Sequence, residues 1–206
     1  MKVLVINGSP RVNGNTTLAL EEMINIFKSN EVEVDYIQVG NMAIRGCTAC
    51  GACHNTIGTC AIDDIVNEVA KKFEECDGMV VASPVYYANA NATLVALLDR
   101  LFYSSRFDKR MKVGASVVVA RRGGASSTFD QLNKYFTYSG MPLASSQYWN
   151  SVHGGAKGEA KEDLEGLQTM RTLANNMIFL MRSIELGKEK FGLPEKEKPE
   201  RTSFVR

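Results

Sequence analysis

One segment near the start of the chain constrains the fold most. It passes from a buried strand into a polar loop and then into a helix. Val3 to Ile6 is an unbroken aliphatic and β-branched run, typical of a central parallel strand covered on both faces. From Asn7 to Asn15 the residues change to types that turn the backbone and expose polar donors. From Thr16 onward the apolar residues recur mostly at three- and four-residue spacing, which predicts a helix whose N-terminus faces the loop.

This loop predicts a phosphate site, because free amide groups meet the positive end of the helix dipole there. A nucleoside triphosphate loop would need G-x-x-x-x-G-K-[ST], but Gly14 is followed by Asn15 and no lysine. A dinucleotide loop would need G-x-G-x-x-G, which Pro10 breaks. A terminal monophosphate such as that of FMN remains, although the segment alone also fits a simple turn and N-cap. The candidate ligands are Ser9, Arg11, Asn13, Asn15, Thr16 and Thr17.

Strand-like and helix-like segments alternate along the rest of the chain. The last helical pattern extends from Leu164 to Ile184 at helical spacing. Five strands alternating with five helices predict an α/β fold with a doubly wound, five-stranded parallel sheet and helices on both faces. The strands expected after the first one cover residues 32–39, 78–83, 113–120 and about 143–149.

The length of 206 residues suits one sizeable core and is too short for two comfortable domains. We expect one FMN-binding domain over residues 1–187, with a cysteine-rich insert at 41–62. Residues 188–206 are charged and broken by prolines, which predicts a surface arm or a segment wrapped around another subunit. The insert, the loop around Trp149 and this arm are more irregular chain than one compact domain usually carries, so we expect a homo-oligomer.

The charge balance and the apolar runs exclude two classes of partner. With 24 basic and 23 acidic residues, the net charge of +1 leaves no large basic surface for a nucleic acid. No apolar run approaches the roughly 20 residues that a membrane helix needs, and no charged leader with a cleavage site precedes the first strand. We therefore expect a soluble, cytoplasmic protein that binds neither nucleic acid nor membrane.

Two later loops should meet the first one at the same edge of the sheet. Ligands of doubly wound sheets bind beyond the carboxyl ends of the strands, so loops beginning at Asn7, Pro84 and Arg121 should converge on one crevice. The second loop brings Tyr86 and Tyr87 to the place where a flat ring such as isoalloxazine would lie. Taken alone, these aromatic residues equally fit packing under the following helix.

Four of the five cysteines lie between residues 47 and 60, which is less like a disulfide framework than like a metal site in a reducing compartment. Their compact spacing can wrap one 4Fe-4S cubane, with each thiolate on a different iron. Four-thiolate zinc sites usually use two separated pairs of ligands. Thiols that hold no metal remain an alternative. The candidate ligands are Cys47, Cys50, Cys53 and Cys60.

Together these motifs resemble the flavodoxin-like NAD(P)H-dependent FMN reductases, and more closely their iron-sulfur flavoprotein branch. The resemblance rests on Gly8-Ser-Pro-Arg with Asn13-x-Asn-Thr, the four cysteines, Ala82-Ser-Pro-Val-Tyr and Leu97-x-Asp-Arg100. It implies a sheet of strand order 2-1-3-4-5, noncovalent FMN with its phosphate in the first loop, and homodimers or homotetramers with the flavin near a subunit boundary. It also implies a flavin ring resting on Pro84, Val85, Tyr86, Tyr87, Arg121, Arg122, Gly123 and Gly124.

Two functions follow from this pattern. In the first, the protein is an NAD(P)H-dependent enzyme that passes hydride to FMN and reduces a small acceptor such as a quinone or an azo compound. In the second, it is a one-electron carrier in which FMN and the cluster exchange electrons with a ferredoxin-type partner, without direct NAD(P)H activity. No residue pair resembles an acid–base or nucleophile constellation, as expected when the cofactor supplies the chemistry.

Overall fold

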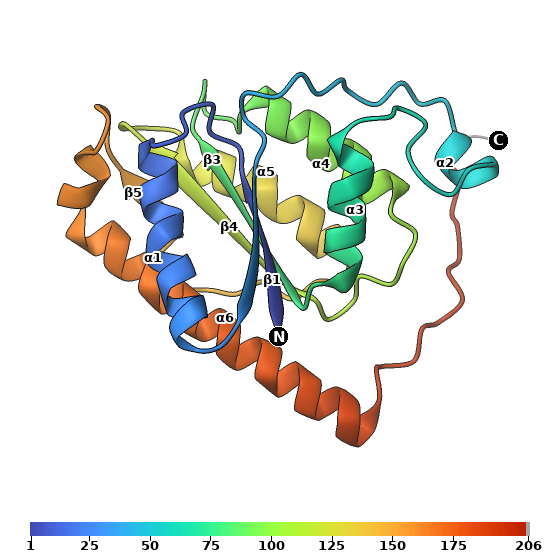
Figure 1. Ribbon diagram of the computed structural model, residues 1–206. Helices are drawn as coiled ribbons and strands as arrows, with labels where there is room; N and C mark the ends of the chain where they lie inside the picture. Colours follow the sequence, from blue (N-terminus) through green and yellow to red (C-terminus); the bar gives the residue numbers. More distant parts are fainter. Residues whose placement is uncertain (205–206) are drawn as a thin grey trace.

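The aliphatic runs form the middle of a parallel sheet of order β2-β1-β3-β4-β5 with helices on both faces (Figure 1), which confirms the expected fold class. The computed structural model describes residues 1–204. The edge position of β2 agrees with its alternating polar residues. The strands are β1 (Lys2–Asn7), β2 (Glu33–Gln38), β3 (Gly78–Pro84), β4 (Val113–Ala120) and β5 (Ser151–His153).

Within residues 1–204, six α-helices cover the sheet or belong to the insert, and α6 is the longest of them. α1 and α6 pack on one face, and α3, α4 and α5 pack on the other. Asp64 caps α3, because its carboxylate accepts a hydrogen bond from the backbone N–H of Val66. The helices are α1 (Asn15–Ser29), α2 (Ala52–Asn55), α3 (Ile65–Glu75), α4 (Ala92–Ser104), α5 (Ala125–Tyr138) and α6 (Leu164–Phe191), with a short 3-10 helix η1 (Glu159–Glu162).

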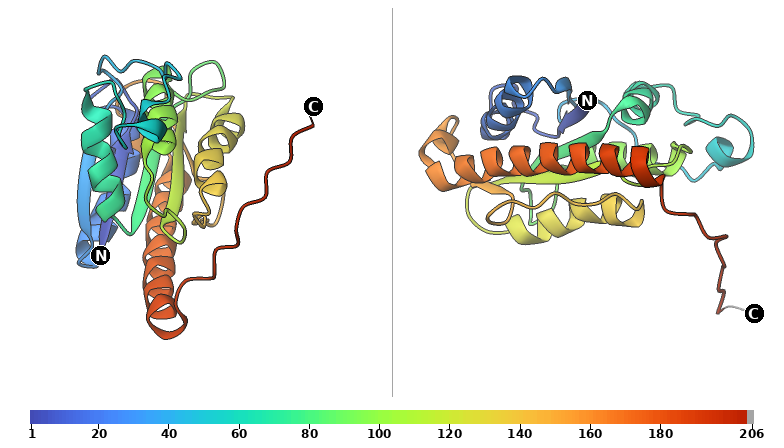
Figure 2. Two further views of the ribbon diagram at one scale, coloured as in Figure 1. Left: turned by 90° about the vertical axis from the view of Figure 1, so that its right-hand side faces the viewer. Right: turned by 90° about the horizontal axis from the view of Figure 1, so that it is seen from below.

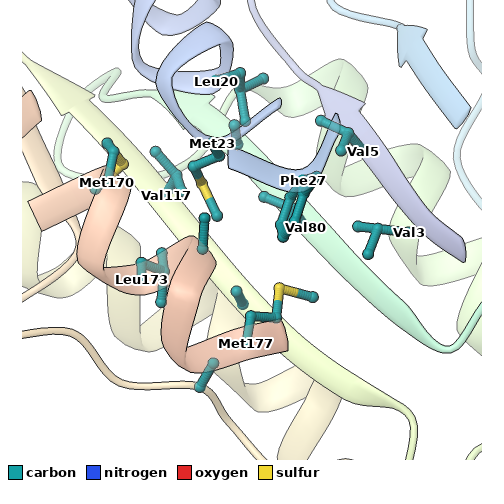
Figure 3. Packing of buried hydrophobic residues seen from close by; sticks show 14 of the residues in the cluster. Val3, Val5, Leu20, Met23, Phe27, Val80, Val117, Met170, Leu173 and Met177 are labelled. Atoms are coloured by element: carbon teal, nitrogen blue, oxygen red, sulfur yellow. The ribbon is translucent and has the colours of Figure 1, made fainter. Parts of the chain in front are cut away.

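Successive side chains of β1 enter two different cores. Val3 and Val5 point toward α1 and α6, whereas Leu4 and Ile6 point toward α3 and α4. Figure 3 shows how the two helices of the first core meet over the strands. The labelled residues of that core are Val3, Val5, Leu20, Met23, Phe27, Val80, Val117, Met170, Leu173 and Met177.

The expected fifth strand at residues 143–149 is wrong. Leu143 forms a single bridge to Gly114, and β5 follows only at Ser151–His153. Between these points the chain bonds to α6 instead of the sheet: Ser146 Oγ donates to the Thr169 carbonyl at 2.7 Å, and Asn176 Nδ2 donates to the Ser145 carbonyl at 2.8 Å. Hydrogen bonds to and from the neighbouring helix therefore replace strand pairing there.

The last helix ends later than expected. α6 continues through Lys188 to Phe191, and an extended segment begins at Gly192. Figure 2 shows this segment leaving the body of the molecule. One contact with the body is the hydrogen bond from Arg110 Nη1 to the Pro194 carbonyl, at 3.0 Å. Among the helices of residues 1–204, none is both long enough and apolar enough to cross a bilayer.

Replacing Phe27 tests the core between α1 and α6. Phe27 is fully buried, so Phe27→Ala should lower the free energy of unfolding by about 3–5 kcal/mol through lost transfer energy and a cavity. The control is Phe179→Ala on α6, because Phe179 is 72% exposed and should cost less than about 1 kcal/mol. Urea unfolding of both variants measures the difference, and equal losses would contradict this core.

A charge network at the opposite end of the sheet from the loops predicts a pH dependence. Lys2 Nζ lies 2.9 Å and Lys72 Nζ 3.2 Å from the Asp35 carboxylate. The bond from Lys2, supported by Lys72, outweighs burial and lowers the pKa of Asp35 below its ordinary value.

A carboxylate whose pKa is lower in the folded state stabilises the fold above its unfolded pKa, and that stability is lost as the pH falls through the folded pKa. Asp35→Asn should therefore destabilise the protein near neutral pH and have a smaller effect at about pH 3. Urea unfolding at both pH values measures this. A cost that does not change with pH would show that the network contributes nothing through its charge.

Candidate functional site

Asn7 organises the loop between β1 and α1, although the sequence did not single it out as a ligand. Its Nδ2 donates to Tyr36 Oη at 2.8 Å and to Thr17 Oγ1 at 3.2 Å, and its Oδ1 accepts from the Ser9 backbone N–H at 2.8 Å. Asn7 is completely buried. The one signal for it is its position as the first polar residue after a buried strand.

The N-terminus of α1 is open. Its N-cap is Gly14, with no side-chain hydrogen bond to the first turn and no acidic residue in that turn. Ser9 Oγ instead accepts from the Arg11 backbone N–H at 3.2 Å. The polar loop residues therefore build a turn but supply no side-chain cap for this helix. A helix N-terminus of this kind is a suitable place for an anion.

The side chains of two predicted phosphate ligands, Asn15 and Thr17, form hydrogen bonds within the protein. Asn15 Oδ1 accepts from the backbone N–H of Gly158 at 2.9 Å and of Ala160 at 3.3 Å, and its Nδ2 donates to the Ala156 carbonyl at 2.8 Å. Thr17 Oγ1 donates to the Val12 carbonyl at 2.7 Å. These side chains shape the loop through intramolecular hydrogen bonds, so they are not free phosphate ligands.

The other predicted ligands of this loop differ in how exposed they are to solvent. Ser9 and Thr16 are buried, whereas Arg11 and Asn13 are exposed. Gly40 packs so closely on the loop that a Cβ there would overlap the Gly8 carbonyl and the Ser9 backbone. The chain just after β2 therefore packs directly against the loop.

The loop after β3 ends in a strained turn. The backbones of Tyr86 and Asn89 exchange two hydrogen bonds, at 2.9 and 3.0 Å, around Tyr87 at φ +50° and Ala88 at φ +60°. Turns of this kind favour glycine or asparagine at these positions. Tyr87 and Ala88 are neither, so their positive φ angles indicate backbone strain, which is concentrated at functional sites. Tyr87 is fully exposed, so packing of these aromatics under the helix is wrong for this residue.

The loop after β4 lies against this turn. Gly124 caps α5 at φ +90°, and its Cα approaches Ala88 so closely that a side chain would not fit. Ser127 Oγ donates to the Ala88 carbonyl at 2.8 Å. Arg121 and Arg122 are exposed at the start of this loop, next to exposed Gly123, while Pro84 and Val85 lie half-buried at the start of the turn. The second and third predicted loops therefore meet.

A shallow hollow of about 580 Å³ lies beyond the ends of β4 and β5. Arg121 and His153 line it, together with three carboxylates that the sequence did not single out. The carboxylate of Glu159 accepts from the Ala156 and Gly155 backbone N–H groups at 2.7 and 2.6 Å, which holds the pKa of Glu159 below its ordinary value. The hollow is lined by Arg121, His153, Gly154, Gly155, Ala156, Glu159, Glu162 and Asp163.

The four clustered cysteines line one small cavity beside the second half of α4. Cys50 is exposed, and the Ala52 backbone N–H lowers the pKa of its thiol. Cys53 is buried, and burial raises the pKa of its thiol. The lining consists of Cys47, Thr48, Cys50, Gly51, Cys53, Cys60, Ala61, Ile62, Arg100, Tyr103 and Ser104.

These thiols do not converge on a single ion. Within residues 1–204, no three His, Cys, Asp or Glu side chains come together as ligands of one metal ion. This disfavours a mononuclear zinc site, which needs four ligands about one centre. Four thiols that line one cavity are the donor set of an iron-sulfur cubane, which places each thiolate on a different iron.

Arg100 is the buried charge of this region, and the sequence noted it only as part of a motif. Its guanidinium donates to the Asp64 carboxylate and to Cys60 Sγ. By contrast, the fifth cysteine, Cys76, lies in the core, and burial raises the pKa of its thiol to about 11. Cys76 is therefore an unreactive packing residue.

Residues 1–156 match the family model of the NADPH-dependent FMN reductases. The chain belongs to this FMN reductase family. This member of the family is 34% identical over 197 residues to an iron-sulfur flavoprotein of Methanocaldococcus jannaschii, with 90% of the chain and all of that protein covered. These comparisons support a flavin-based redox role.

Solved structures extend the likeness of this FMN reductase family member to its fold. The structure of RosB with a bound 8-demethyl-8-formylriboflavin-5'-phosphate intermediate has a TM-score of 0.72 at 14% identity, covering 100% of this chain and 94% of that one. A flavodoxin from the domain Archaea has a TM-score of 0.56 at 16% identity, covering 86% of this chain and 99% of its own. The fold is flavodoxin-like.

The role of Asn15 in the structure can be tested by hydrogen exchange. Asn15→Ala should speed exchange of the Gly158 and Ala160 amides roughly tenfold, because each lost hydrogen bond is worth about 0.5–1.5 kcal/mol. Asn13→Ala is the control, since Asn13 is exposed in the same loop. Equal exchange in both variants, measured by mass spectrometry, would show that Asn15 does not hold this segment.

Proposed function

We propose that this protein is an FMN-dependent oxidoreductase that passes electrons from NAD(P)H or a reduced carrier through FMN to an acceptor. The observation that carries the proposal is an open N-terminus of α1 at the same sheet edge as a strained, exposed aromatic turn. An uncapped helix N-terminus binds a phosphate, and an exposed aromatic turn suits a flat ring. Membership in the FMN reductase family supports the same cofactor.

The chain's own residues divide the work of holding FMN. The amides of residues 15–17 with Ser9 and Arg11 would bind one terminal phosphate, and the buried side chain of Asn7 keeps their loop in place. The turn at Pro84 to Tyr87 and the loop at Arg121 to Gly124 would hold the ring. Bound FMN supplies the hydride and single-electron chemistry. Arg121 and Arg122 would attract an anionic donor.

We further propose that Cys47, Cys50, Cys53 and Cys60 hold a 4Fe-4S cluster. The four thiols line one shared cavity, and their compact spacing suits a cubane better than the two separated ligand pairs of a four-thiolate zinc site. The name of the Methanocaldococcus jannaschii relative supports iron and sulfide. None of the residues lining this cavity belongs to the three flavin loops, so the two cofactors would be bound independently.

A second candidate function is a one-electron carrier that exchanges electrons with a ferredoxin-type protein and lacks direct NAD(P)H activity. Cys47 and Cys50 are exposed, which favours electron exchange with a protein partner at this surface. We also propose a cytoplasmic homodimer or homotetramer. The segment from Gly192, extended away from the body, supports a role as an arm on a neighbouring subunit (Figure 2).

Replacing one cysteine separates the two cofactors. Cys50→Ser should abolish the binding of iron and sulfide and leave FMN unchanged, because Cys50 lines the cysteine cavity and none of the flavin loops. Cys76→Ala is the control, since this buried thiol lies outside the cavity and its loss should leave both cofactors bound. Iron and sulfide assays of anaerobically reconstituted protein, with chromatography of the flavin released on denaturation, measure both.

Three results would overturn parts of this proposal. Release of FAD would contradict the monophosphate site. Wild-type protein without iron and sulfide would contradict the cluster and, with it, the carrier function. Loss of FMN from Cys50→Ser would show that the cysteine segment belongs to the flavin site. Steady-state NADH and NADPH oxidation by Cys50→Ser then distinguishes the enzyme, which keeps this activity, from the carrier, which lacks it.

A further inference from the structure

Cys60 differs from the other clustered cysteines in its surroundings. Two nitrogens of Arg100 donate to its sulfur: Nε lies 3.3 Å and Nη2 lies 3.2 Å from Cys60 Sγ. Arg100 is only 1% exposed, so this guanidinium cannot turn toward solvent. Cys47 and Cys50 are exposed, and neither has a donor of this kind among residues 1–204.

The two terminal nitrogens of the guanidinium have further partners that hold it in place. Nη1 and Nη2 bind the two oxygens of the Asp64 carboxylate at 2.5 and 2.8 Å, in the fork geometry typical of arginine. Nη1 also donates to the Arg45 carbonyl, and Nη2 donates to the Ile62 carbonyl, each at 3.1 Å. Asp64 is held in turn as the N-cap of α3. Arg100 therefore joins α4 to both ends of the cysteine insert.

The backbone of Cys60 is held as well. Asn67 Oδ1 accepts from the Cys60 backbone N–H, and Asn67 Nδ2 donates to the Cys60 carbonyl, each at 3.0 Å. Cys60 thus has its backbone fixed by α3 and its sulfur fixed by α4. A ligand held in this way needs little ordering when a cluster binds.

We propose that Arg100 is a positioning residue for Cys60 that also raises the reduction potential of the cluster. This inference rests on the proposed function. Hydrogen bonds to a ligand sulfur withdraw electron density and favour the reduced cluster, which carries one more negative charge. Asp64 offsets much of the charge of Arg100, so the effect would come mainly from the two directed N–H groups. The reduction adds one electron from a reduced donor and breaks no bond.

The test compares midpoint potentials in variants that keep the fold. Arg100→Lys retains the charge without the fork, and Arg100→Gln combined with Asp64→Asn avoids leaving a carboxylate unpaired in a partly buried site. Arg106→Gln is the matched control, because Arg106 is exposed and donates to the His54 carbonyl of the insert rather than to a cysteine sulfur. Potentials are measured by redox titration of the reduced cluster's paramagnetic resonance signal.

Both Arg100 variants should favour the oxidised cluster roughly tenfold, which is about 59 mV more negative for one electron. The Arg106 variant and the flavin potential should not change. Loss of iron from a folded, FMN-containing double variant, with iron retained in Arg106→Gln, would also support the positioning of Cys60. Iron and potential unchanged in both Arg100 variants would overturn this inference alone. Wild-type protein without iron and sulfide would overturn the cluster proposal as well.

Discussion

The requirement to bury β1 on both faces determines where the rest of the chain can lie. Val3 to Ile6 are fully buried, so helices must cover both sides of this strand. The chain leaves β1 toward one face as α1 and leaves β3 toward the other as α4. Because β1 and β3 are neighbours, their loops diverge at the carboxyl edge of the sheet, which is where ligands of doubly wound sheets bind. The three predicted flavin loops all begin at that edge, where β1, β3 and β4 end.

Several backbone features at this edge are unfavourable when the local sequence is considered alone, and contacts with the surrounding structure stabilise them. α1 begins at the glycine N-cap Gly14 without a side-chain hydrogen bond to its first turn, which costs a few tenths of a kcal/mol relative to a serine or aspartate cap. Tyr87 and Ala88 adopt positive φ, and Gly124 must approach Ala88 closely to hold their turn. Such departures are expected where a ligand, and not the chain alone, completes the structure.

The cysteine insert depends on a different kind of interaction. Its apolar packing is limited to Cys53 and, in part, Ile44 and Cys60, and the ion pair of Arg100 with Asp64 adds a fixed polar anchor. An ion pair at such a site contributes little net stability, but removing one partner is costly, which makes it suited to specifying one arrangement. The same guanidinium that orders the insert also reaches the sulfur of Cys60. Folding of the insert and the chemical environment of this ligand are therefore coupled.

The sequence by itself determined the features that depend on local pattern. Two local patterns were sufficient to predict the fold class: the aliphatic run of β1 and the spacing of apolar residues in α1 and α6. The polar loops after the strands and the compact cysteine motif were sufficient to predict which segments form the candidate sites. Local pattern also placed a fifth strand at residues 143–149, where apolar residues occur. Only the tertiary structure decided that this segment bonds to α6, because its partners, such as Thr169 and Asn176, lie far along the chain.

The site shows the same division. The polar loop after β1 was recognisable, but the roles within it were not: Asn7 bonds to Tyr36, and Asn15 bonds to Gly158. The hydrogen bonds from Arg100 to Cys60 likewise join residues that no helical or strand period relates. Periodicity and residue type are local properties, so they predict elements and candidate residues. Which donor meets which acceptor depends on how those elements pack, and that was decided by the tertiary structure alone.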